Sequence, residues 1–401
     1  MRTIIQSLLF FALLLLGCFQ TLSAAEPSTV ESPHNSLIKE EIADGWILLF
    51  DGETLFGWEP GSKCDWKADG GVIRVTAGEQ GILHTTCEFA DYRLKVDFRA
   101  PKETNSGIFL RTPGVPTDPK VDCYELNIAD PSISPFPTGN FVGRKKGDAA
   151  ATPGEWHSYD LTAEGGHFFV SLDGKQVLDY TDEKPPPRGF IGLQYNAGPC
   201  EFRDIKLKPL NQKSLFNGKD LTGWKPFAGE KQKSVLTVKD GAINIQNGPG
   251  QLETEQQFAD FTLQAEVFSN GKHLNSGIFF RGIPGEFQNG YECQIQNGYK
   301  DNDRTKPEDS GTGGIYRRQN ARKVVSDDFE WFTMTLCTNG PHFAAWVNGY
   351  QVSDWADLRP PHNNPRNGSR LEAGTLIIQG HDATTDLSFR NLRAVELPKG
   401  K

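Results

Sequence analysis

The chain has 401 residues, of which 51 are acidic and 42 are basic, so its net charge is -9. This balance excludes the broad basic surface that nucleic-acid binding requires. With 42 glycines, 25 prolines and only two methionines, the composition favours many short strands joined by turns over long helices. The length is that of two domains rather than one.

The N-terminus has the features of a secretory signal peptide. Arg2 supplies a positive charge, residues 4–16 form an apolar run too short to span a bilayer comfortably, and small residues at 23–25 offer a cleavage site. We therefore expect residues 1–25 to be a signal peptide and the protein to be exported, to the periplasm or the cell surface. One alternative stays open, because the sequence LLGC resembles a lipoprotein box in which Cys18 carries a lipid and tethers the protein to the membrane.

A polar stretch over residues 26–43 is expected to act as a tether. Six cysteines follow the leader. Export permits disulfides, but the sequence does not choose among the pairings. None of these cysteines has the paired CxxC spacing of a zinc site.

The main signal is an internal repeat. Short phrases of the first half return in the same order in the second half, with an offset that grows along the chain. We therefore predict two copies of one domain, at 44–210 and 211–398, with insertions accumulating in the second. The clearest matches are LFDGETLFGW (49–58) with LFNGKDLTGW (215–224), NSGIFLRT (105–112) with NSGIFFRG (275–282), YELNI (124–128) with YECQI (291–295), and FRDI (202–205) with FRNL (389–392).

Each copy is predicted to be all-β. Short runs rich in β-branched and aromatic residues recur throughout, and long helical periodicity is absent. Asp173-Gly174 and Asn348-Gly349 lie between apolar runs, which is the strongest short signal for a β-hairpin. The number of strands predicts a two-sheet sandwich or jelly roll in each copy. We expect Trp58, Trp224, Trp156 and Trp331 to be core anchors rather than sugar platforms.

Strand parity gathers polar residues of the second copy on one face. Alternate side chains of a strand point to opposite faces of the sheet. If the three strands concerned are neighbours, a polar cleft results, and Gly277 leaves room in it for a ligand. The residues that parity places on this face are Asn275 and Arg281 with Gly277, then Glu292 and Gln294, then Gln379 and His381.

These phrases, LFNGKDLTGW, NSGIFFRG, YECQIQ and FRNL, together resemble the 3-keto-disaccharide hydrolase domain, and the first copy carries the same set more loosely. The resemblance covers nearly the whole chain after the leader. It implies two tandem concanavalin A-like jelly-roll β-sandwiches and an exported carbohydrate-active protein. It also implies cleavage of glycosides already oxidised at C3, which calls for a partner sugar oxidoreductase that makes the 3-keto substrate.

The implied chemistry gives each polar residue a candidate role. A ketone at C3 acidifies the C2 hydrogen, so a base can remove it, the group on C1 can leave, and water can add afterwards. Glu292 and His381 are the candidate bases, and Arg281 is a candidate for holding the developing oxyanion or for pairing with Glu292. A divalent metal on Glu292 and His381 is an open option. The candidate substrate-binding residues are Asn275, Gln294, Tyr316 and Gln379.

The first copy keeps part of this set. Arg111 and Glu125 repeat the expected ion pair, while Asn127 stands in place of Gln294 and Asn196 in place of His381. We therefore expect the second copy to hold the main catalytic site. The first copy would bind glycan or support the second, through Asn105, Arg111, Glu125 and Asn127.

Other classes of function stay open. Both copies can be non-catalytic, lectin-like carbohydrate-binding modules, since a sandwich with a polar face commonly binds sugars without cutting them. A purely structural surface protein is a third possibility. Arg281 and Glu292 can also form an ion pair that serves only the fold.

Overall fold

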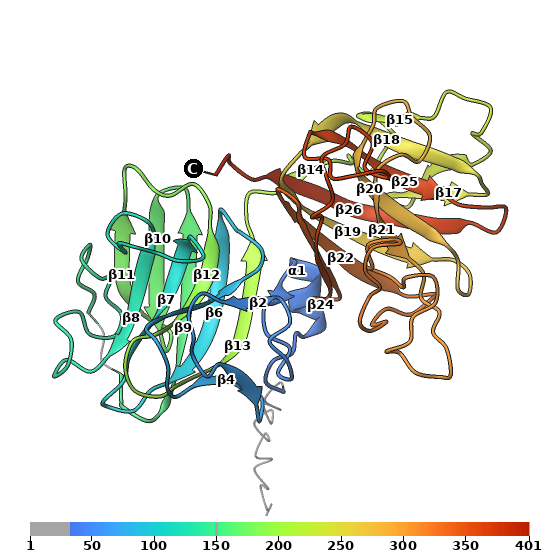
Figure 1. Ribbon diagram of the computed structural model, residues 1–401. Helices are drawn as coiled ribbons and strands as arrows, with labels where there is room; N and C mark the ends of the chain where they lie inside the picture. The colour runs from blue at the N-terminus through green and yellow to red at the C-terminus, as the bar shows by residue number, and fades with distance from the viewer. Residues whose placement is uncertain (1–32, 149–150, 401) are drawn as a thin grey trace, which may run out of the picture. The chain divides into compact units, whose positions relative to one another are not determined.

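The computed structural model describes residues 33–148 and 151–400, which form almost only β-structure (Figure 1). The predicted signal peptide, Cys18 and the tether up to residue 32 lie outside the described residues. Residues 39–44 form a short helix, α1 (Lys39–Asp44). Within the described part of the chain, no helix is long and apolar enough to cross a membrane.

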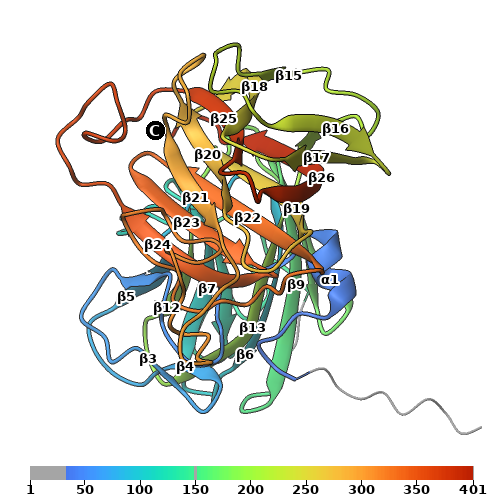
Figure 2. The same cartoon turned by 90° about the vertical axis from the view of Figure 1, so that its right-hand side faces the viewer.

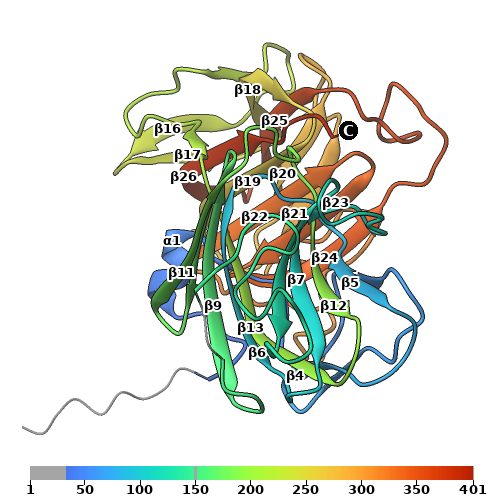
Figure 3. The same ribbon diagram turned by 90° about the vertical axis from the view of Figure 1, so that its left-hand side faces the viewer.

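The first half forms two antiparallel sheets (Figure 3). The smaller sheet has the order β2 (Trp58–Pro60), β5 (Gly81–Thr85), β12 (Phe190–Tyr195), β7 (Asn105–Thr112) and β8 (Tyr124–Ala129). The larger has the order β11 (Lys175–Thr181), β10 (His167–Leu172), β9 (Trp156–Glu164), β6 (Tyr92–Arg99), β13 (Cys200–Pro209), β4 (Val72–Val75) and β3 (Lys67–Asp69), with β1 (Ile47–Leu48) paired to β13.

The second half repeats this plan strand for strand (Figure 2). Its smaller, inner sheet has the order β15 (Trp224–Pro226), β18 (Gly250–Phe258), β25 (Gly374–Gly380), β20 (Ser276–Gly282) and β21 (Tyr291–Ile295). Its larger, outer sheet has the order β16 (Val235–Lys239), β17 (Ala242–Gln246), β26 (Asp386–Glu396), β19 (Phe261–Ser269), β22 (Trp331–Asn339), β23 (His342–Val347) and β24 (Tyr350–Ala356), with β14 (Lys213–Ser214) paired to β26.

Alternating apolar residues of the two sheets meet in the core of each sandwich. Strands of both layers of the second sandwich, such as β19 and β20, contribute to one hydrophobic cluster. Trp58 and Trp224 are buried, and their indole N–H groups donate to the carbonyl oxygens of Leu49 and Leu215. The predicted fold, tandem jelly-roll sandwiches of the concanavalin A-like kind, is confirmed.

The two hairpin predictions are also confirmed. Asp173-Gly174 connects β10 to β11, and Asn348-Gly349 connects β23 to β24. All four residues have positive φ, between 48° and 77°. Positive φ at both central positions is the geometry of a tight hairpin turn, and asparagine, aspartate and glycine tolerate it best.

One core prediction is wrong. Trp331, expected in the core, keeps 36% of its surface exposed at the start of β22 on the outer sheet. Its counterpart Trp156 is half-buried. The described cysteines, Cys64, Cys87, Cys123, Cys200, Cys293 and Cys337, are all unpaired.

We predict that Trp224→Phe destabilises the protein by about 1–2 kcal/mol, because the partly buried carbonyl of Leu215 loses its donor. Urea unfolding followed by circular dichroism measures the change. Trp331→Phe is the matched control and should change stability by less than about 0.5 kcal/mol, because its ring is partly exposed. Equal losses in the two variants would contradict this account.

Candidate active site

Glu292 lies on the inner sheet of the second sandwich, on the face away from the core. In the register of β20 and β21, Glu292 is opposite Phe279 and Gln294 is opposite Gly277. The alternate residues of β21, which are Tyr291, Cys293 and Ile295, belong to the hydrophobic cluster. Glu292 is nevertheless only 8% exposed, because loops cover this face of the sheet.

Gly277 allows the Glu292 side chain to lie close over the sheet. A Cβ atom at position 277 would lie 2.7 Å from Glu292 Oε1, which is closer than a Cβ atom approaches any non-bonded neighbour. The space above this glycine, expected to receive a ligand, is therefore occupied by the carboxyl group itself. Any larger residue at 277 must displace Glu292.

The Glu292 carboxyl group lines a pocket of about 250 Å³ with a basic wall. Tyr316, Arg317 and Arg318 come from the loop between β21 and β22, and the Tyr316 N–H donates to the Glu292 carbonyl oxygen. Arg366 comes from the loop between β24 and β25 and donates to the Gln288 carbonyl oxygen. The pocket thus combines one carboxyl group with several guanidinium groups and a phenol.

Burial changes the acidity of this carboxyl group. Loss of solvent raises the pKa of Glu292 to about 8, Arg366 and Arg317 oppose the rise, and Asp309 adds to it. No described residue forms a hydrogen bond or ion pair with the carboxyl group. A carboxyl group with a pKa near neutrality, inside a pocket, is suited to transfer a proton to or from a ligand.

On the same face of the inner sheet, two glutamine side chains each have an oxygen without a partner. Asn275 Nδ2 donates to Asp309 Oδ2 at 2.6 Å, and Gln294 Nε2 donates to Asn275 Oδ1 at 3.1 Å. Gln379 Nε2 donates to Gln288 Oε1 at 3.3 Å. The Oε1 atoms of Gln294 and Gln379 are buried and have no partner. Such acceptors suit hydroxyl donors of a ligand, because a buried acceptor without a partner is costly.

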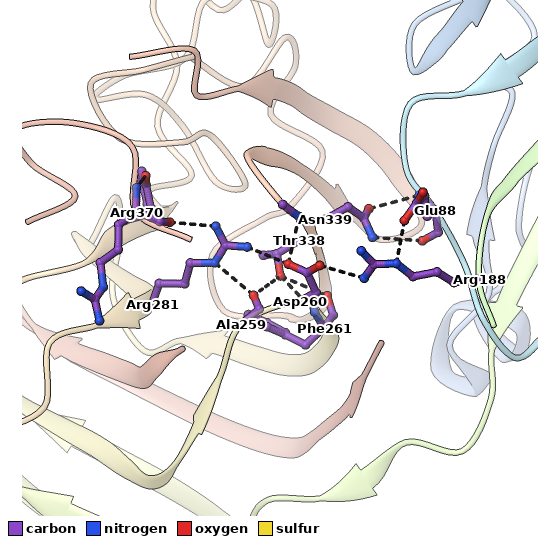
Figure 4. A network of polar contacts seen from close by, with 11 residues as sticks. Glu88, Arg188, Ala259, Asp260, Phe261, Arg281, Thr338, Asn339 and Arg370 are labelled. Carbon is purple, nitrogen blue, oxygen red and sulfur yellow. Dashed lines mark hydrogen bonds and ion pairs between the residues drawn. The ribbon is translucent and has the colours of Figure 1, made fainter. Parts of the chain in front are cut away.

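The structure corrects the expected pairing of Arg281 with Glu292. The register of β20 shifts between Phe279 and Gly282, and Arg281 has a φ of 49°. This bulge turns the side chain away from the face that simple alternation predicts. Its guanidinium is fully buried and donates to Asp260 Oδ1 at 2.9 Å and to the carbonyl oxygens of Ala259 and Arg370 (Figure 4).

Arg111 in the first sandwich is placed in the same way. It has a φ of 51°, is 2% exposed, and pairs with Asp91 at 3.0 Å rather than with Glu125. It also donates to the Ala90 and Pro186 carbonyl oxygens. The two arginines therefore hold loops and neighbouring strands together, and neither reaches the carboxyl group that parity assigned to it.

His381 does not lie beside Glu292. The residue opposite Phe279 on β25 is Ile377, and His381 lies four residues further along, or about 13 Å at the rise of an extended strand. Its ring is 43% exposed and bonds Asp382 Oδ2 at 2.8 Å. The register therefore does not support a shared proton-transfer site or a divalent metal held by Glu292 and His381 together.

Among the described residues, His34, Asp97 and Asp204 alone place three ligand atoms close enough for a metal ion, within 4.8 Å. Arg203 Nε already lies 3.6 Å from Asp97 and 3.8 Å from Asp204. A cationic side chain thus occupies the neighbourhood of these carboxylates. We assign no metal to them.

The first sandwich keeps the acid but not its surroundings. Glu125 is opposite Phe109 and 5% exposed, and burial raises its pKa to about 7, opposed by a hydrogen bond with Gln194. Asn127 Nδ2 donates to the Phe136 carbonyl oxygen, and its Oδ1 has no partner. Asn105 is the first residue of β7 and is opposite Ala129 on β8. Where the second copy has Tyr316 and Arg317, the first has Val142 and Gly143.

Sequence reasoning missed the basic residues over Glu292 and the neighbouring Asp309. Arg366 lies in an insertion that the first copy lacks, and Arg317 and Asp309 lie in a long loop. The growing offset between the copies was a signal that these loops are longer. The offset did not show which residues of these loops lie over the sheet.

Comparison with known proteins places the chain in a family. The model of the 3-keto-alpha-glucoside-1,2-lyase-like domain matches residues 45–208 and again residues 211–394, so the chain belongs to this family. A 3-keto-disaccharide hydrolase of Bacteroides thetaiotaomicron is 24% identical over 254 residues, which are 48% of this chain and 85% of that protein. The chain is thus a member of a hydrolase and lyase family that acts on carbohydrates.

Solved structures give weaker similarities. A Parabacteroides distasonis protein provisionally assigned as a glycosyl hydrolase is 20% identical, with a TM-score of 0.39, over 44% of this chain and 100% of that chain. A carbohydrate-binding module of Bacillus subtilis is 14% identical, with a TM-score of 0.30, over 38% of this chain and 95% of its own.

We predict that Glu292 makes stability depend on pH. Burial raises its pKa from the ordinary 4.5 to about 8, so the folded state binds this proton more tightly than the unfolded state. Relative to Glu292→Gln, the wild type should therefore lose stability as pH rises from 4.5 through 8. Urea midpoints across this range measure the difference. The exposed-site variant Glu255→Gln should keep the wild-type slope, and an unchanged slope in Glu292→Gln would contradict the assignment.

Arg281→Met should destabilise the protein by about 3 kcal/mol, because Asp260 and the carbonyl groups of Ala259 and Arg370 each lose a charged donor in a buried place. Lys225→Met is the matched control: its pair with Glu255 is exposed and should contribute less than about 1 kcal/mol. Urea unfolding compares the two. A stable Arg281→Met variant that had lost activity alone would restore a direct catalytic role for Arg281.

Proposed function

We propose that this protein is an exported enzyme that cleaves 3-keto-glycosides, with its main site in the second sandwich and Glu292 as the proton-transfer group. Family membership supports the substrate class. The observation that carries the proposal is the desolvated Glu292 carboxyl group, with its pKa raised to about 8, in a pocket with a basic wall.

The reaction begins at C2 of the oxidised sugar. The Glu292 carboxylate takes the C2 proton, and the electron pair of that bond moves onto the C3 oxygen as an enolate. Arg366 and Arg317 stabilise the negative oxygen, since positive groups in a partly dry pocket act strongly on developing charge. A base with a pKa near the working pH is efficient in this step.

Elimination and hydration complete the cleavage. The enolate electron pair re-forms the C3 ketone, a double bond forms between C1 and C2, and the C1–O bond to the leaving group breaks. Tyr316 lines the same pocket, and its hydroxyl is our candidate for protonating the leaving oxygen. Water then adds at C1 and a proton returns to C2, so the net reaction is hydrolysis.

Acceptors for substrate hydroxyl groups lie on the same face of the inner sheet as Glu292. The free oxygens of Gln294 and Gln379 and the Asn275 amide are proposed to bind them. Arg281 is proposed to act as a positioning residue, because it fixes the carbonyl of Arg370 in the loop that carries Arg366. We give His381 no part in proton transfer.

The alternative function is non-catalytic carbohydrate binding, and the first sandwich favours it. Glu125 is buried there, but the counterparts of Tyr316 and Arg317 are Val142 and Gly143. A base without a group to hold the enolate oxygen is poorly equipped for elimination. We propose that the first sandwich binds glycan or supports the second.

The biological setting is also part of the proposal. The predicted leader directs the protein to the periplasm or cell surface, with Cys18 as an optional lipid anchor. A C3 ketone does not occur in ordinary disaccharides, so an oxidoreductase that oxidises the C3 hydroxyl must supply the substrate.

Incubation with a 3-keto disaccharide, with release of free sugar as the readout, tests the proposal. Glu292→Gln should lower kcat by about 10²–10⁴-fold, the usual contribution of a general base. Glu125→Gln, the matched change in the first sandwich, should lower it by less than about threefold. Full activity of Glu292→Gln would refute the assignment, and binding without any product from the wild type would favour the module.

A further inference from the structure

A second hollow lies on the outer sheet of the second sandwich, in the layer opposite the Glu292 pocket. It has a volume of about 580 Å³ and is lined by residues of β16, β17, β26, β19 and the start of β22. Figure 2 shows these strands side by side, as the sheet order requires. We propose that this hollow, the outer groove, binds a neutral oligosaccharide independently of the Glu292 pocket.

The floor of the outer groove is a set of amides held by one carboxylate. Asp386 accepts hydrogen bonds from Asn244 Nδ2, Gln246 Nε2 and Asn270 Nδ2, each at 3.0 Å. Asn244 and Asn270 also donate to Ser388 Oγ, at 3.2 Å and 3.1 Å. Because their N–H groups face Asp386, the amide oxygens are left to accept from a ligand. Fixed acceptors of this kind suit sugar hydroxyl groups.

Aromatic residues form one wall of the outer groove. Trp331 and Phe268 both line it, with ring centroids 5.4 Å apart. Arg390 lies 3.9 Å from the Trp331 ring and is held by Glu266 at 2.7 Å, which fixes the ring and leaves 36% of the tryptophan exposed. An exposed, immobilised aromatic beside hydrogen-bonding groups offers an apolar surface to the C–H face of a sugar.

The first sandwich shows what this surface looks like without a groove. Across neighbouring strands, Asn244, Ser388 and Phe268 form one row of the second sandwich. The corresponding row of the first sandwich is Arg74, Glu201 and Arg99. There Arg74 Nε and Arg99 Nε both donate to Glu201, at 2.8 Å and 2.7 Å. Ion pairs thus cover a surface that the second sandwich lines with an amide, a hydroxyl and a phenyl ring.

The charge of the outer groove favours a neutral ligand. Lys239 and Arg390 are balanced by Asp240 and Asp386. A strong anion would face two carboxylates, and a cation would face two basic groups. The uncharged groups between them, three amides and Ser388, match the hydroxyl groups of a neutral sugar.

Titration calorimetry with the full chain and three probes, maltotriose, cellotriose and mannotriose, tests the proposal. We expect at least one probe to bind the wild type. Trp331→Ala and Asn244→Arg, which installs the residue of the first sandwich, should each weaken that binding by about tenfold or more. Trp156→Ala in the first sandwich and Glu292→Gln in the pocket should leave it within about twofold.

The outcomes separate the two sites. Failure of all three probes to bind the wild type would overturn the proposal. Binding that survives Trp331→Ala and Asn244→Arg, or that disappears in Glu292→Gln, would place the sugar elsewhere and overturn it as well. Thermal unfolding by circular dichroism shows whether each variant is folded. Two chemically unlike substitutions keep the test valid if one of them misfolds.

Discussion

The ion pair between the buried Arg281 guanidinium and Asp260 joins the two layers of the second sandwich, and the candidate site depends on it. Arg281 belongs to the inner sheet, while Asp260 immediately precedes a strand of the outer sheet. The same guanidinium binds the carbonyl of Arg370, in the loop that carries Arg366. Because an unpaired buried charge costs several kcal/mol, the two layers and this loop must meet at one place. Through its hydrogen bond to Arg370, Arg281 thus holds the loop that carries Arg366 in place, although Arg281 itself does not contact Glu292.

Asp260 also connects this pair to the first half of the chain. Its Oδ2 atom binds Arg188 at 2.7 Å, and Arg188 Nε binds Glu88 Oε2 at 2.8 Å (Figure 4). The backbone N–H of Gly340 also donates to this carboxylate, at 2.9 Å. In the first sandwich, Asp91 accepts from Arg111, from Gly165 N–H and from Asn211. The same pairing of a buried arginine with an aspartate therefore occurs in both copies. This structural role explains why Arg111 and Arg281 repeat although neither reaches a ligand pocket.

The fold and about half of the residues of the candidate site could be predicted from the sequence. Strand parity placed Glu292 and Gln294 on one face because β21 is regular and its alternate residues form the core. Parity failed at Arg281, because a bulge breaks the alternation and a bulge leaves no clear mark in one sequence. It failed at His381 because that residue lies beyond the end of its strand. The position of Arg366 could not be predicted, because tertiary contacts decide whether a long loop folds back over a sheet.

The two copies thus share a frame and differ on both of their polar surfaces. Each inner sheet carries a buried glutamate, but only the second copy has Tyr316, Arg317 and the inserted Arg366 around it. Each outer sheet carries a tryptophan beneath an arginine, but ion pairs cover that surface in the first copy and amides line it in the second. Duplication preserved the packing and left loops and surface rows free to diverge.

The proposed chemistry depends on the protonation of Glu292, and carbon-13 NMR of glutamate-labelled protein measures it directly. The Glu292 side-chain carboxyl signal is assigned by its loss in Glu292→Gln and then followed as a function of pH. We predict a titration midpoint near 8, far above the ordinary 4.5. A midpoint near 4.5 would show a solvated carboxylate and would contradict the proposed role of this residue.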